Sequence, residues 1–285
     1  MRLTQQQITT FQETVWEYFR HGRRSMLWRP SEALAKEGST LDPYLILVSE
    51  LMLQQTQVPQ VIPKFESFIK RFPDIEVLAD APLAEVLGEW SGLGYNRRAK
   101  FLHEAAKRVV KDFKGKLPEA HDDLVKLPGV GPNTAGAILA YAYNQPVVFI
   151  ETNIRTVFIH HFFHDQFDID DKQIRELLEQ TLDPENPREF YWALMDYGTH
   201  LKQTLPSRNN QSKHYKKQSP LAGSPREMRG RIIRALVGSA LDENTLRLTV
   251  KSDERFDPAL DALAREGLVY QQNKKWCLTG ESDIR

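Results

Sequence analysis

The run of small residues between Leu127 and Ala137 is the feature that most constrains how this chain can fold. It reads Leu-Pro-Gly-Val-Gly-Pro-Asn-Thr-Ala-Gly-Ala and lies between two segments with helical periodicity. Pro128 ends the first helix, while Gly129 and Gly131 permit a tight turn that exposes amides at the start of the second. Such amides can hold phosphates regardless of nucleotide sequence. An ordinary turn would not need the second glycine, so we predict an anion-binding hairpin.

Helical patterns occupy most of the chain, and the fold class is predicted to be mainly α. Thr4 and Gln7 form a capping-box pattern before an amphipathic helix. Asp42 and Pro43 are typical of a helix start, and the apolar helix that follows should run to about Val58. Further helices are predicted at 61–71, 83–90, 97–113, 121–127, 132–142, 153–163, 171–182 and 188–201.

The sequence predicts a core at residues 1–206, a basic linker at 207–225 and a small domain at 226–285. The linker is rich in Ser, Asn and Gln. In the small domain we predict helices at 226–237, 243–250 and 258–265, and then a hairpin of strands 268–272 and 275–279. Three helices and a hairpin resemble a winged-helix module, which could contact either DNA or a protein.

Charge and cysteine content narrow the class of protein. The net charge is zero, which taken alone argues against nucleic-acid binding, but basic residues gather at 95–116 and 202–217. A single cysteine, Cys277, excludes an internal disulfide and a cluster held by several thiolates. No long apolar run or signal-peptide pattern occurs, so we expect an intracellular protein, in the cytoplasm and nucleoid or in a nucleus.

Glu50 is the most unusual residue of the apolar helix. Leu47 and Leu53 flank it at helical spacing, and Gln54 and Gln57 should extend a polar stripe from it. Desolvation in such surroundings raises the pKa of a carboxyl, so that it can hold a proton near neutral pH and act as a general acid. The alternative is a structural glutamate that braces a neighbouring loop.

Three segments resemble one known family. They are Ser-Glu-Leu-Met-Leu-Gln-Gln-Thr-Gln-Val at 49–58, Trp-Ser-Gly-Leu-Gly-Tyr-Asn-Arg-Arg-Ala at 90–99, and the glycine-rich run at 127–137. Together they are similar to adenine DNA glycosylases of the MutY type, within the helix-hairpin-helix glycosylases that include endonuclease III. The similarity runs from about Phe19 to Leu201. It implies a two-lobed helix-hairpin-helix glycosylase fold acting on duplex DNA with a flipped base.

This resemblance assigns catalytic roles. Glu50 falls on the acid that protonates adenine at N7, which weakens the glycosidic bond. Glu151, 18 positions after Asn133, falls where the family has an aspartate that stabilises the oxocarbenium ion. It is one methylene longer, and a helix start at 152 or 153 would favour its anion. Asn133 replaces the lysine of bifunctional relatives, so no Schiff base and no lyase step are expected.

The resemblance also implies binding residues. Leu93 and Tyr95 should act as wedges at the opposite base, although either could simply pack in the core. The predicted DNA contacts are Gln55, Thr56, Leu93, Tyr95, Arg97, Gly129, Val130, Gly131, Thr134, Lys213, Lys216 and Lys217. The predicted base pocket consists of Trp28, Arg29, Leu53, Gln54, Asn153 and Trp192. Trp192 occupies a position where the family often has Gln or Glu.

Two departures from the family concern cofactors and recognition. The four cluster-binding cysteines are absent, and their spacing counted from Lys202 falls on Asn209, Ser212 and Gln218. We therefore expect no iron–sulfur cluster and no other cofactor, although a monovalent cation at the hairpin would be compatible. The family's 8-oxoguanine recognition domain is replaced by the shorter module. His160 and His164 share a helix face without a third ligand, so we predict no metal there.

The expected function is hydrolytic removal of a mispaired base in base excision repair, first of all adenine opposite 8-oxoguanine or guanine. A thymine or uracil mismatch glycosylase is the nearest alternative. A catalytically weak DNA-damage sensor is an alternative from another class. The expected partner is double-stranded DNA with a mismatch or damaged base, with no membrane involved, and the family precedent indicates a monomer.

Overall fold

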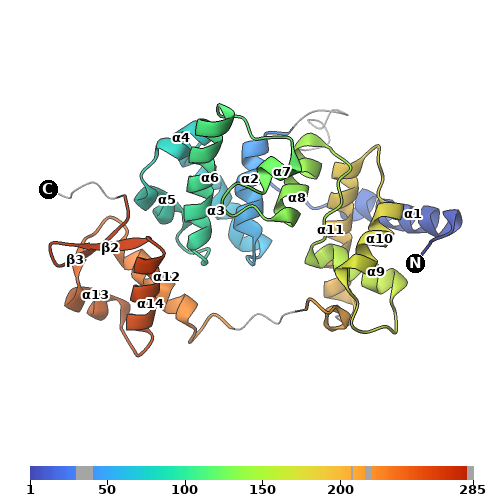
Figure 1. The fold of residues 1–285 in the computed structure, drawn as a ribbon. Coiled ribbons are helices and arrows are strands. Elements are labelled where there is room, and N and C mark those ends of the chain that lie inside the picture. The colour runs from blue at the N-terminus through green and yellow to red at the C-terminus, as the bar shows by residue number, and fades with distance from the viewer. Residues whose placement is uncertain (30–40, 207, 216–219, 281–285) are drawn as a thin grey trace. The chain divides into compact units, whose positions relative to one another are not determined.

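The computed structural model describes residues 1–29, 41–206, 208–215 and 220–280. The chain forms two compact units, each assembled from separate stretches. The first unit contains residues 1–46, 119–125 and 130–217, and the second contains 47–118, 126–129 and 218–285. The mainly α class predicted from the sequence is confirmed (Figure 1).

The first unit is built around helix α11 (Pro187–Thr204), which packs against several of the others. Helix α9 lies beside it (Figure 1). Aromatic residues form its core, where Phe149 stacks on Tyr191 with ring centroids 4.2 Å apart. The other helices of this unit are α1 (Gln5–Gly22), α7 (His121–Leu124), α8 (Pro132–Tyr143), α9 (Thr152–Phe162), α10 (Asp171–Thr181) and the 3-10 helix η1 (Asn209–Gln211).

Helix α2 (Pro43–Leu53) starts where the sequence predicts. The Asp42 carboxylate accepts a hydrogen bond from the Tyr44 amide at 2.9 Å, which satisfies a free amide of the first turn. The predicted capping box of α1 is also present, since the Thr4 hydroxyl accepts from the Gln7 amide. The end of α2 differs, because the helix stops at Leu53 rather than near Val58.

The second unit surrounds α6 (Arg97–Phe113), against which α4 and α5 pack. The left-handed conformation of Lys114 ends α6. The other helices of its first part are α3 (Val58–Arg71), α4 (Ile75–Asp80) and α5 (Leu83–Trp90). Helix α4 was not predicted, and Asp74 caps it by accepting from the Val77 amide at 2.8 Å.

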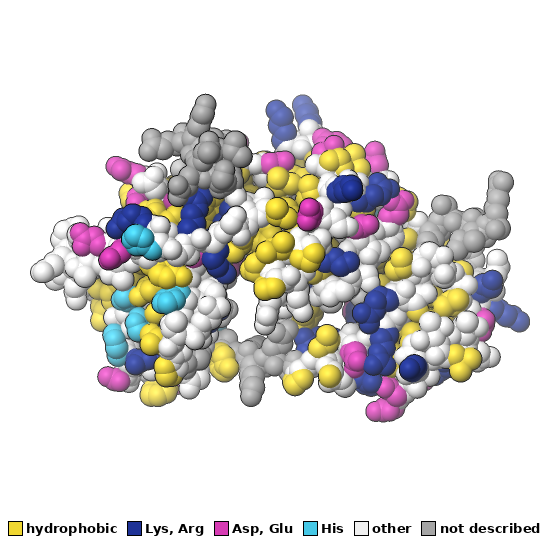
Figure 2. Space-filling model, turned by 180° about the vertical axis from the view of Figure 1, so that it is seen from behind, with side chains coloured by type: hydrophobic (Ala, Val, Ile, Leu, Met, Phe, Trp, Pro, Cys, Tyr) yellow, Lys and Arg dark blue, Asp and Glu magenta, His cyan; other side chains and the backbone are white. Residues whose placement is uncertain are grey.

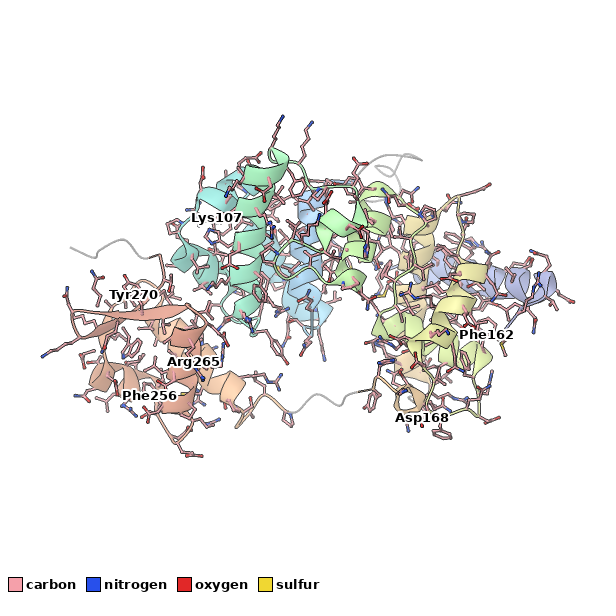
Figure 3. The ribbon with its side chains drawn as sticks, in the orientation of Figure 1. Lys107, Phe162, Asp168, Phe256, Arg265 and Tyr270 are labelled. Atoms are coloured by element: carbon pink, nitrogen blue, oxygen red, sulfur yellow. The ribbon has the colours of Figure 1, made fainter. Side chains whose placement is uncertain are left out.

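The C-terminal module, residues 225–280, combines three helices with a three-stranded antiparallel sheet of order β1-β3-β2. Its core contains the fully buried Phe256 (Figure 3). The Arg247 guanidinium lies 4.3 Å from the centre of the Phe256 ring. The hairpin forms as predicted, with Asn273 and Lys274 both at positive φ. Its elements are α12 (Pro225–Leu236), β1 (Leu241–Asp242), α13 (Glu243–Val250), α14 (Phe256–Arg265), β2 (Val269–Gln272) and β3 (Lys275–Leu278).

The segment at 208–213 belongs to the first unit, although its composition predicts a linker. The Ile169 amide donates to the Gln211 carbonyl at 3.0 Å, and the Lys213 amide donates to the Ile169 carbonyl at 3.0 Å. Asn209 accepts from the Thr156 hydroxyl of α9 at 2.8 Å. Hydrogen bonds therefore tie this polar segment to the helical core. None of the helices in the described stretches has the length and apolarity needed to cross a membrane.

Candidate active site

Glu50 lies in the last turn of α2 and is half-buried between the fully buried Ser49 and Leu51. The polar stripe predicted to continue from it along the helix does not form. Gln54 and Gln57 lie beyond the end of α2. The reason is local, because Gln55 adopts a left-handed conformation with φ 58° that turns the chain out of the helix.

A buried arginine, Arg98, closes the end of α2. Its guanidinium donates to the carbonyls of Leu51 at 2.8 Å and Met52 at 2.9 Å, and also to the Gln54 carbonyl. The last carbonyls of a helix have no partner within the helix, so Arg98 supplies the missing donors. The side chain is 7% exposed, and burial lowers the pKa of Arg98 to about 10. The group therefore stays charged at neutral pH.

Arg98 also holds the two loops that were predicted to face the opposite base. It donates to the Thr56 hydroxyl at 2.9 Å in the loop after α2, and to the Gly94 carbonyl at 3.1 Å in the loop before α6. Its guanidinium lies 5.4 Å from the centre of the Tyr95 ring. Sequence reasoning missed Arg98, because nothing in the pattern separates it from the exposed cations around it.

The predicted wedge residues differ in exposure. Leu93 is only 6% exposed, whereas Tyr95 is half-buried and has a positive φ of 48°. Gln55 and Arg97 are both exposed. The wedge roles of Leu93 and Tyr95 remain predictions, with Leu93 largely packed in the structure.

The first glycine of the hairpin is required by its surroundings. Gly129 has φ 79°, and a Cβ there would lie 2.9 Å from Phe101 Cβ and 3.3 Å from Leu51 Cδ2. The Gln54 side chain donates to the Gly129 carbonyl at 3.2 Å, which links the α2 turn to the hairpin. Only a residue without a side chain fits this close packing.

Gly131 does not share that requirement. It is the N-cap of α8 with φ −86°, and a Cβ on it would meet nothing within 4 Å. The sequence argument that both glycines are needed for the turn is therefore correct only for Gly129. Helix α8 starts at Pro132 as predicted, with Val130 buried and Thr134 half-buried beside the exposed Gly131.

Glu151 is the N-cap of α9, which starts at Thr152, one of the two starts predicted. Burial raises the pKa of Glu151, and the nearby Arg155 opposes this shift. Burial, the larger of these two effects, therefore favours the protonated carboxyl, whereas the helix start was expected to favour the anion. Asn133, which is exposed, accepts a hydrogen bond from the Ile150 amide at 3.4 Å and so steadies the backbone next to Glu151.

The predicted base-pocket residue Arg29 is already engaged in a buried ion pair. Its guanidinium lies 2.9 and 3.0 Å from the two carboxylate oxygens of Asp196, which also accepts from Arg24 at 2.7 Å. Burial lowers the pKa of Arg29, and Asp196 opposes that shift. The base-pocket role of Arg29 stays a prediction, because Asp196 accepts only from its Nη1, while its buried Nε has no hydrogen-bond partner in the described part of the chain.

Asp196 was missed by sequence reasoning, although a signal existed. It is an acid inside the apolar run Phe-Tyr-Trp-Ala-Leu-Met-Asp-Tyr of α11, the same anomaly that singled out Glu50. Trp192, one turn earlier, is 2% exposed and lies 5.4 Å from the Arg29 guanidinium. Trp28 is buried as well, while Leu53 is half-buried in the other unit.

Asn153 has a buried side-chain oxygen with no hydrogen-bond partner in the described part of the chain. It lies in the first turn of α9, against Gly198 of α11, where a Cβ would come within 2.4 Å of the Asn153 carbonyl oxygen. A buried acceptor without a donor is costly unless a ligand or water supplies one. This observation is compatible with the predicted base-pocket role of Asn153.

The residues at the family's cluster positions do not fit an iron–sulfur cluster held by thiolates. Asn209 and Ser212 are hydrogen-bonded, and Gln218 lies outside the described residues. The described stretches contain no group of three or more His, Cys, Asp or Glu that could hold a metal. Lys213 has a side chain that is 62% exposed and lies 3.7 Å from Asp170, while Lys216 and Lys217 also fall outside the described residues.

Figure 2 shows several histidine side chains close together on part of the face drawn. His160 and His161 lie in α9, but the helix ends at Phe162, so His164 does not share its face as predicted. The rings of His160 and His164 have centroids 5.9 Å apart. His161 bonds to the Tyr197 hydroxyl at 3.1 Å, and burial lowers the pKa of His161 to about 4. The imidazole of His161 is therefore neutral at physiological pH and serves the packing of this unit.

Comparisons with known proteins agree with this architecture. Residues 48–184 match the HhH-GPD superfamily base excision DNA repair protein family. The adenine DNA glycosylase of Mycolicibacterium smegmatis is 31% identical over 287 residues, which cover 93% of this chain and 95% of that protein. This chain belongs to the adenine DNA glycosylase family.

Other adenine DNA glycosylases are longer than this chain. The one from Buchnera aphidicola (subspecies Baizongia pistaciae) is 38% identical over 193 residues, which cover 66% of this chain and 52% of that protein. The one from Mus musculus is 33% identical and is covered over 50% of its length. The chain thus spans about half the length of several relatives that it matches.

Solved structures place this adenine DNA glycosylase family member among helix-hairpin-helix glycosylases, as the sequence predicts. A thermostable thymine-DNA glycosylase aligns with a TM-score of 0.59 at 25% identity, covering 68% of this chain and 86% of that one. A trapped endonuclease III–DNA covalent intermediate aligns with a TM-score of 0.58 at 19% identity, covering 79% and 94%. The second likeness shows the fold alone.

Proposed function

We propose that this protein is a monofunctional DNA N-glycosylase of base excision repair, which removes adenine mispaired with 8-oxoguanine or guanine. The observation that carries the proposal is the position of Glu50, a half-buried carboxyl in the last turn of an apolar helix whose end Arg98 closes. Relatives named adenine DNA glycosylase at 31 and 38% identity support the choice of base. Duplex DNA is the proposed partner, and the protein acts as a monomer without a cofactor.

In the proposed reaction, Glu50 donates a proton to N7 of the flipped adenine. The bond between the sugar C1′ and N9 then breaks, and the bonding electron pair leaves with the protonated base. The sugar becomes an oxocarbenium ion, which the carboxylate of Glu151 stabilises until water adds to C1′ and loses a proton to the carboxylate left on Glu50. Because burial raises the pKa of Glu151, this step needs a pH at which that carboxyl is ionised.

Asn133 supports a reaction that stops at the abasic site. Its side-chain amide cannot form a Schiff base with the sugar, and its oxygen accepts a hydrogen bond from the Ile150 amide. We therefore propose that both DNA strands stay intact after the base is released. The position of Asn133 next to the Glu151 backbone gives it a structural task in place of the nucleophilic one.

A mismatch glycosylase that removes thymine or uracil is the second candidate. The likeness to a thermostable thymine-DNA glycosylase favours it, at 25% identity and a TM-score of 0.59. The buried Trp192 also differs from the Gln or Glu that we expect in an adenine pocket. A catalytically weak sensor of damage is the third, and the raised pKa of Glu151 is the observation in its favour.

One experiment separates these functions. Duplexes with A opposite 8-oxoguanine, A opposite G, T opposite G and U opposite G are incubated with the protein, and abasic sites are then cleaved with alkali. We expect release of adenine only, and no cleavage before alkali. Glu50→Gln should lose release, whereas Glu66→Gln, an exposed glutamate on α3, should keep it.

Each other outcome contradicts a defined part of the proposal. Release of thymine or uracil without adenine would show that the protein is the mismatch glycosylase of the second candidate function. Tight mismatch binding with no release from any duplex would indicate a sensor. Strand cleavage without alkali would overturn the role given to Asn133. Unchanged base release by Glu50→Gln would show that Glu50 is not the general acid.

A further inference from the structure

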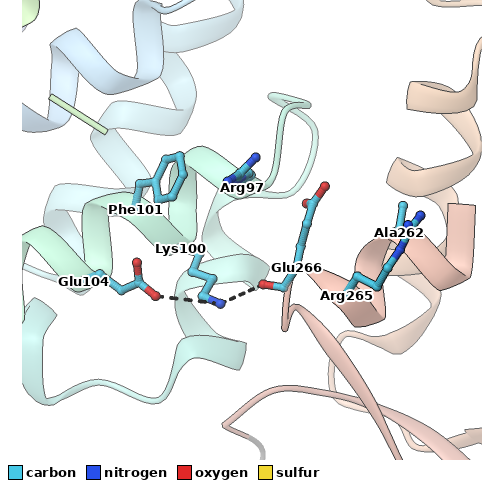
Figure 4. A pocket seen from close by; sticks show the side chains of 7 residues that line it. All are labelled: Arg97, Lys100, Phe101, Glu104, Ala262, Arg265 and Glu266. Atoms are coloured by element: carbon cyan, nitrogen blue, oxygen red, sulfur yellow. Dashed lines mark hydrogen bonds and ion pairs between the residues drawn. The ribbon is translucent and has the colours of Figure 1, made fainter. Parts of the chain in front are cut away.

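A groove in the second unit separates α6 from the end of α14 (Figure 4). It has a volume of about 440 Å³ and is open to solvent. Its lining residues come from two distant parts of the sequence, the helix after the Tyr95 loop and the C-terminal module. They are Arg97, Lys100, Phe101, Glu104, Ala262, Arg265 and Glu266.

The acids of the groove are already neutralised. The carboxylate of Glu266 accepts from Arg229, with one contact at 2.9 Å. Glu104 lies 3.7 Å from the ammonium group of Lys100, which also donates to the Glu266 backbone carbonyl at 2.7 Å. These contacts fix Lys100 across the groove, between α6 and the C-terminal module.

Two arginines of the groove have no ion pair within the described part of the chain. Arg97 is exposed, and its guanidinium lies 4.9 Å from the centre of the Phe101 ring, a contact that holds it beside the groove. Arg265 is exposed at the end of α14. Since the acids are paired, these two arginines give the groove an excess of positive charge and two guanidinium groups with free donors, which suit phosphate oxygens.

The groove adjoins the loop to which we assign DNA contact. Arg226, at the start of α12, donates a hydrogen bond to the Tyr95 hydroxyl, and its guanidinium lies 5.2 Å from the centre of the Tyr95 ring. The Tyr95 ring is thus in contact with both Arg98 and Arg226, and Arg97 follows two residues later. The C-terminal module is therefore attached at the loop predicted to face DNA.

We propose that this groove binds a phosphodiester of duplex DNA, so that the C-terminal module extends the DNA-binding surface beyond the damaged base pair. The inference rests on the proposed function. It assigns Arg265, together with the predicted DNA contact Arg97, a contact with the DNA backbone, and it chooses DNA over a protein as the partner of the module. Contacts of this kind are independent of base sequence and position the enzyme on its substrate.

The test measures the affinity of the full chain for an undamaged duplex across a series of salt concentrations. Losing one phosphate contact should lower the slope of log K against log salt by about 0.9, and the affinity by about eightfold at about 0.1 M salt. We expect these changes in Arg265→Gln and larger ones in Arg265→Glu. Arg234→Gln, which removes an exposed arginine of α12 outside the groove, is the matched control and should leave slope and base release unchanged.

Two outcomes would overturn the groove as a phosphate site. One is a slope that Arg265→Gln and Arg97→Gln leave unchanged, as expected if the module contacts a protein. The other is an equal loss in Arg234→Gln, which would indicate a diffuse electrostatic effect. Base release by the unaltered protein is measured separately. A wrong glycosylase proposal would show as missing base release, whereas a wrong phosphate site would show as an unchanged salt slope in the groove variants.

Discussion

Replacing Arg98 with methionine removes a buried guanidinium but keeps a long side chain. The carbonyl oxygens of Leu51 and Met52 lose donors at 2.8 and 2.9 Å, and both residues are fully buried, so water cannot replace them easily. Each unsatisfied buried acceptor costs about 1–3 kcal/mol. The lost contacts to Thr56 and Gly94 add to this, and we expect a total of about 3–5 kcal/mol, comparable to breaking a buried charged network.

Urea unfolding measures this loss, and amide hydrogen exchange in the last turn of α2 locates it. Arg97→Met is the matched control, because the neighbouring arginine is exposed and should change stability by less than about 0.5 kcal/mol. A loss below about 1 kcal/mol in Arg98→Met, or equal losses in both variants, would refute the view that Arg98 closes the helix. Unchanged exchange at the end of α2 would refute it as well.

Three further changes test other parts of the structure. Glu151→Gln should abolish base release yet stabilise the fold at neutral pH. Burial raises the pKa of Glu151, so ionisation of this carboxyl costs stability as the pH rises through that pKa. Urea unfolding of the variant and the unaltered protein at acidic and neutral pH checks this, and a difference in stability that is the same at both pH values would contradict it. Asp196→Asn leaves Arg29 buried without its anion and should cost about 3–5 kcal/mol, seen as a lower Tm. Gly136→Ala would place a Cβ 2.7 Å from Phe149 Cβ, so overpacking should cost about 1–3 kcal/mol in the same assay.

Short-range signals in the sequence predicted local structure well. The capping residues Thr4 and Asp42 act within a single turn, and their hydrogen bonds form as expected. Pro132 at the start of α8 and the turn at Asn273 and Lys274 are likewise fixed by backbone preferences of a few residues. Such features depend on chemistry that neighbouring residues supply.

The failures arose where a distant residue decides the outcome. Helix α2 ends at Leu53 because Gln55 turns the chain and Arg98, far along the sequence, satisfies the last carbonyls. The strand Leu241–Asp242 has only two residues and exists through pairing with β3, so no periodicity could indicate it. The engagement of Arg29 by Asp196 likewise joins two segments that no local pattern connects.

Sequence motifs located the candidate catalytic residues, but only the structure shows how buried they are and what they contact. Glu50 and Glu151 were found from an anomalous acid and from a family spacing, and these roles stay predictions. The upward shift of the Glu151 pKa depends on burial, which the spacing does not report. The groove beside Arg97 also needed the fold, because Arg265 comes from the other end of the chain.

The sharing of Arg98 by two loops has an evolutionary consequence. Because one guanidinium bonds to both the Thr56 loop and the Gly94 loop, a substitution that moves one loop also disturbs the hydrogen bond to the other. Substitutions in one loop and in the other should then be non-additive in a double-mutant cycle. If these loops face the opposite base as proposed, we expect a change in base preference to need substitutions in both loops, and loss of Arg98 to affect both loops together.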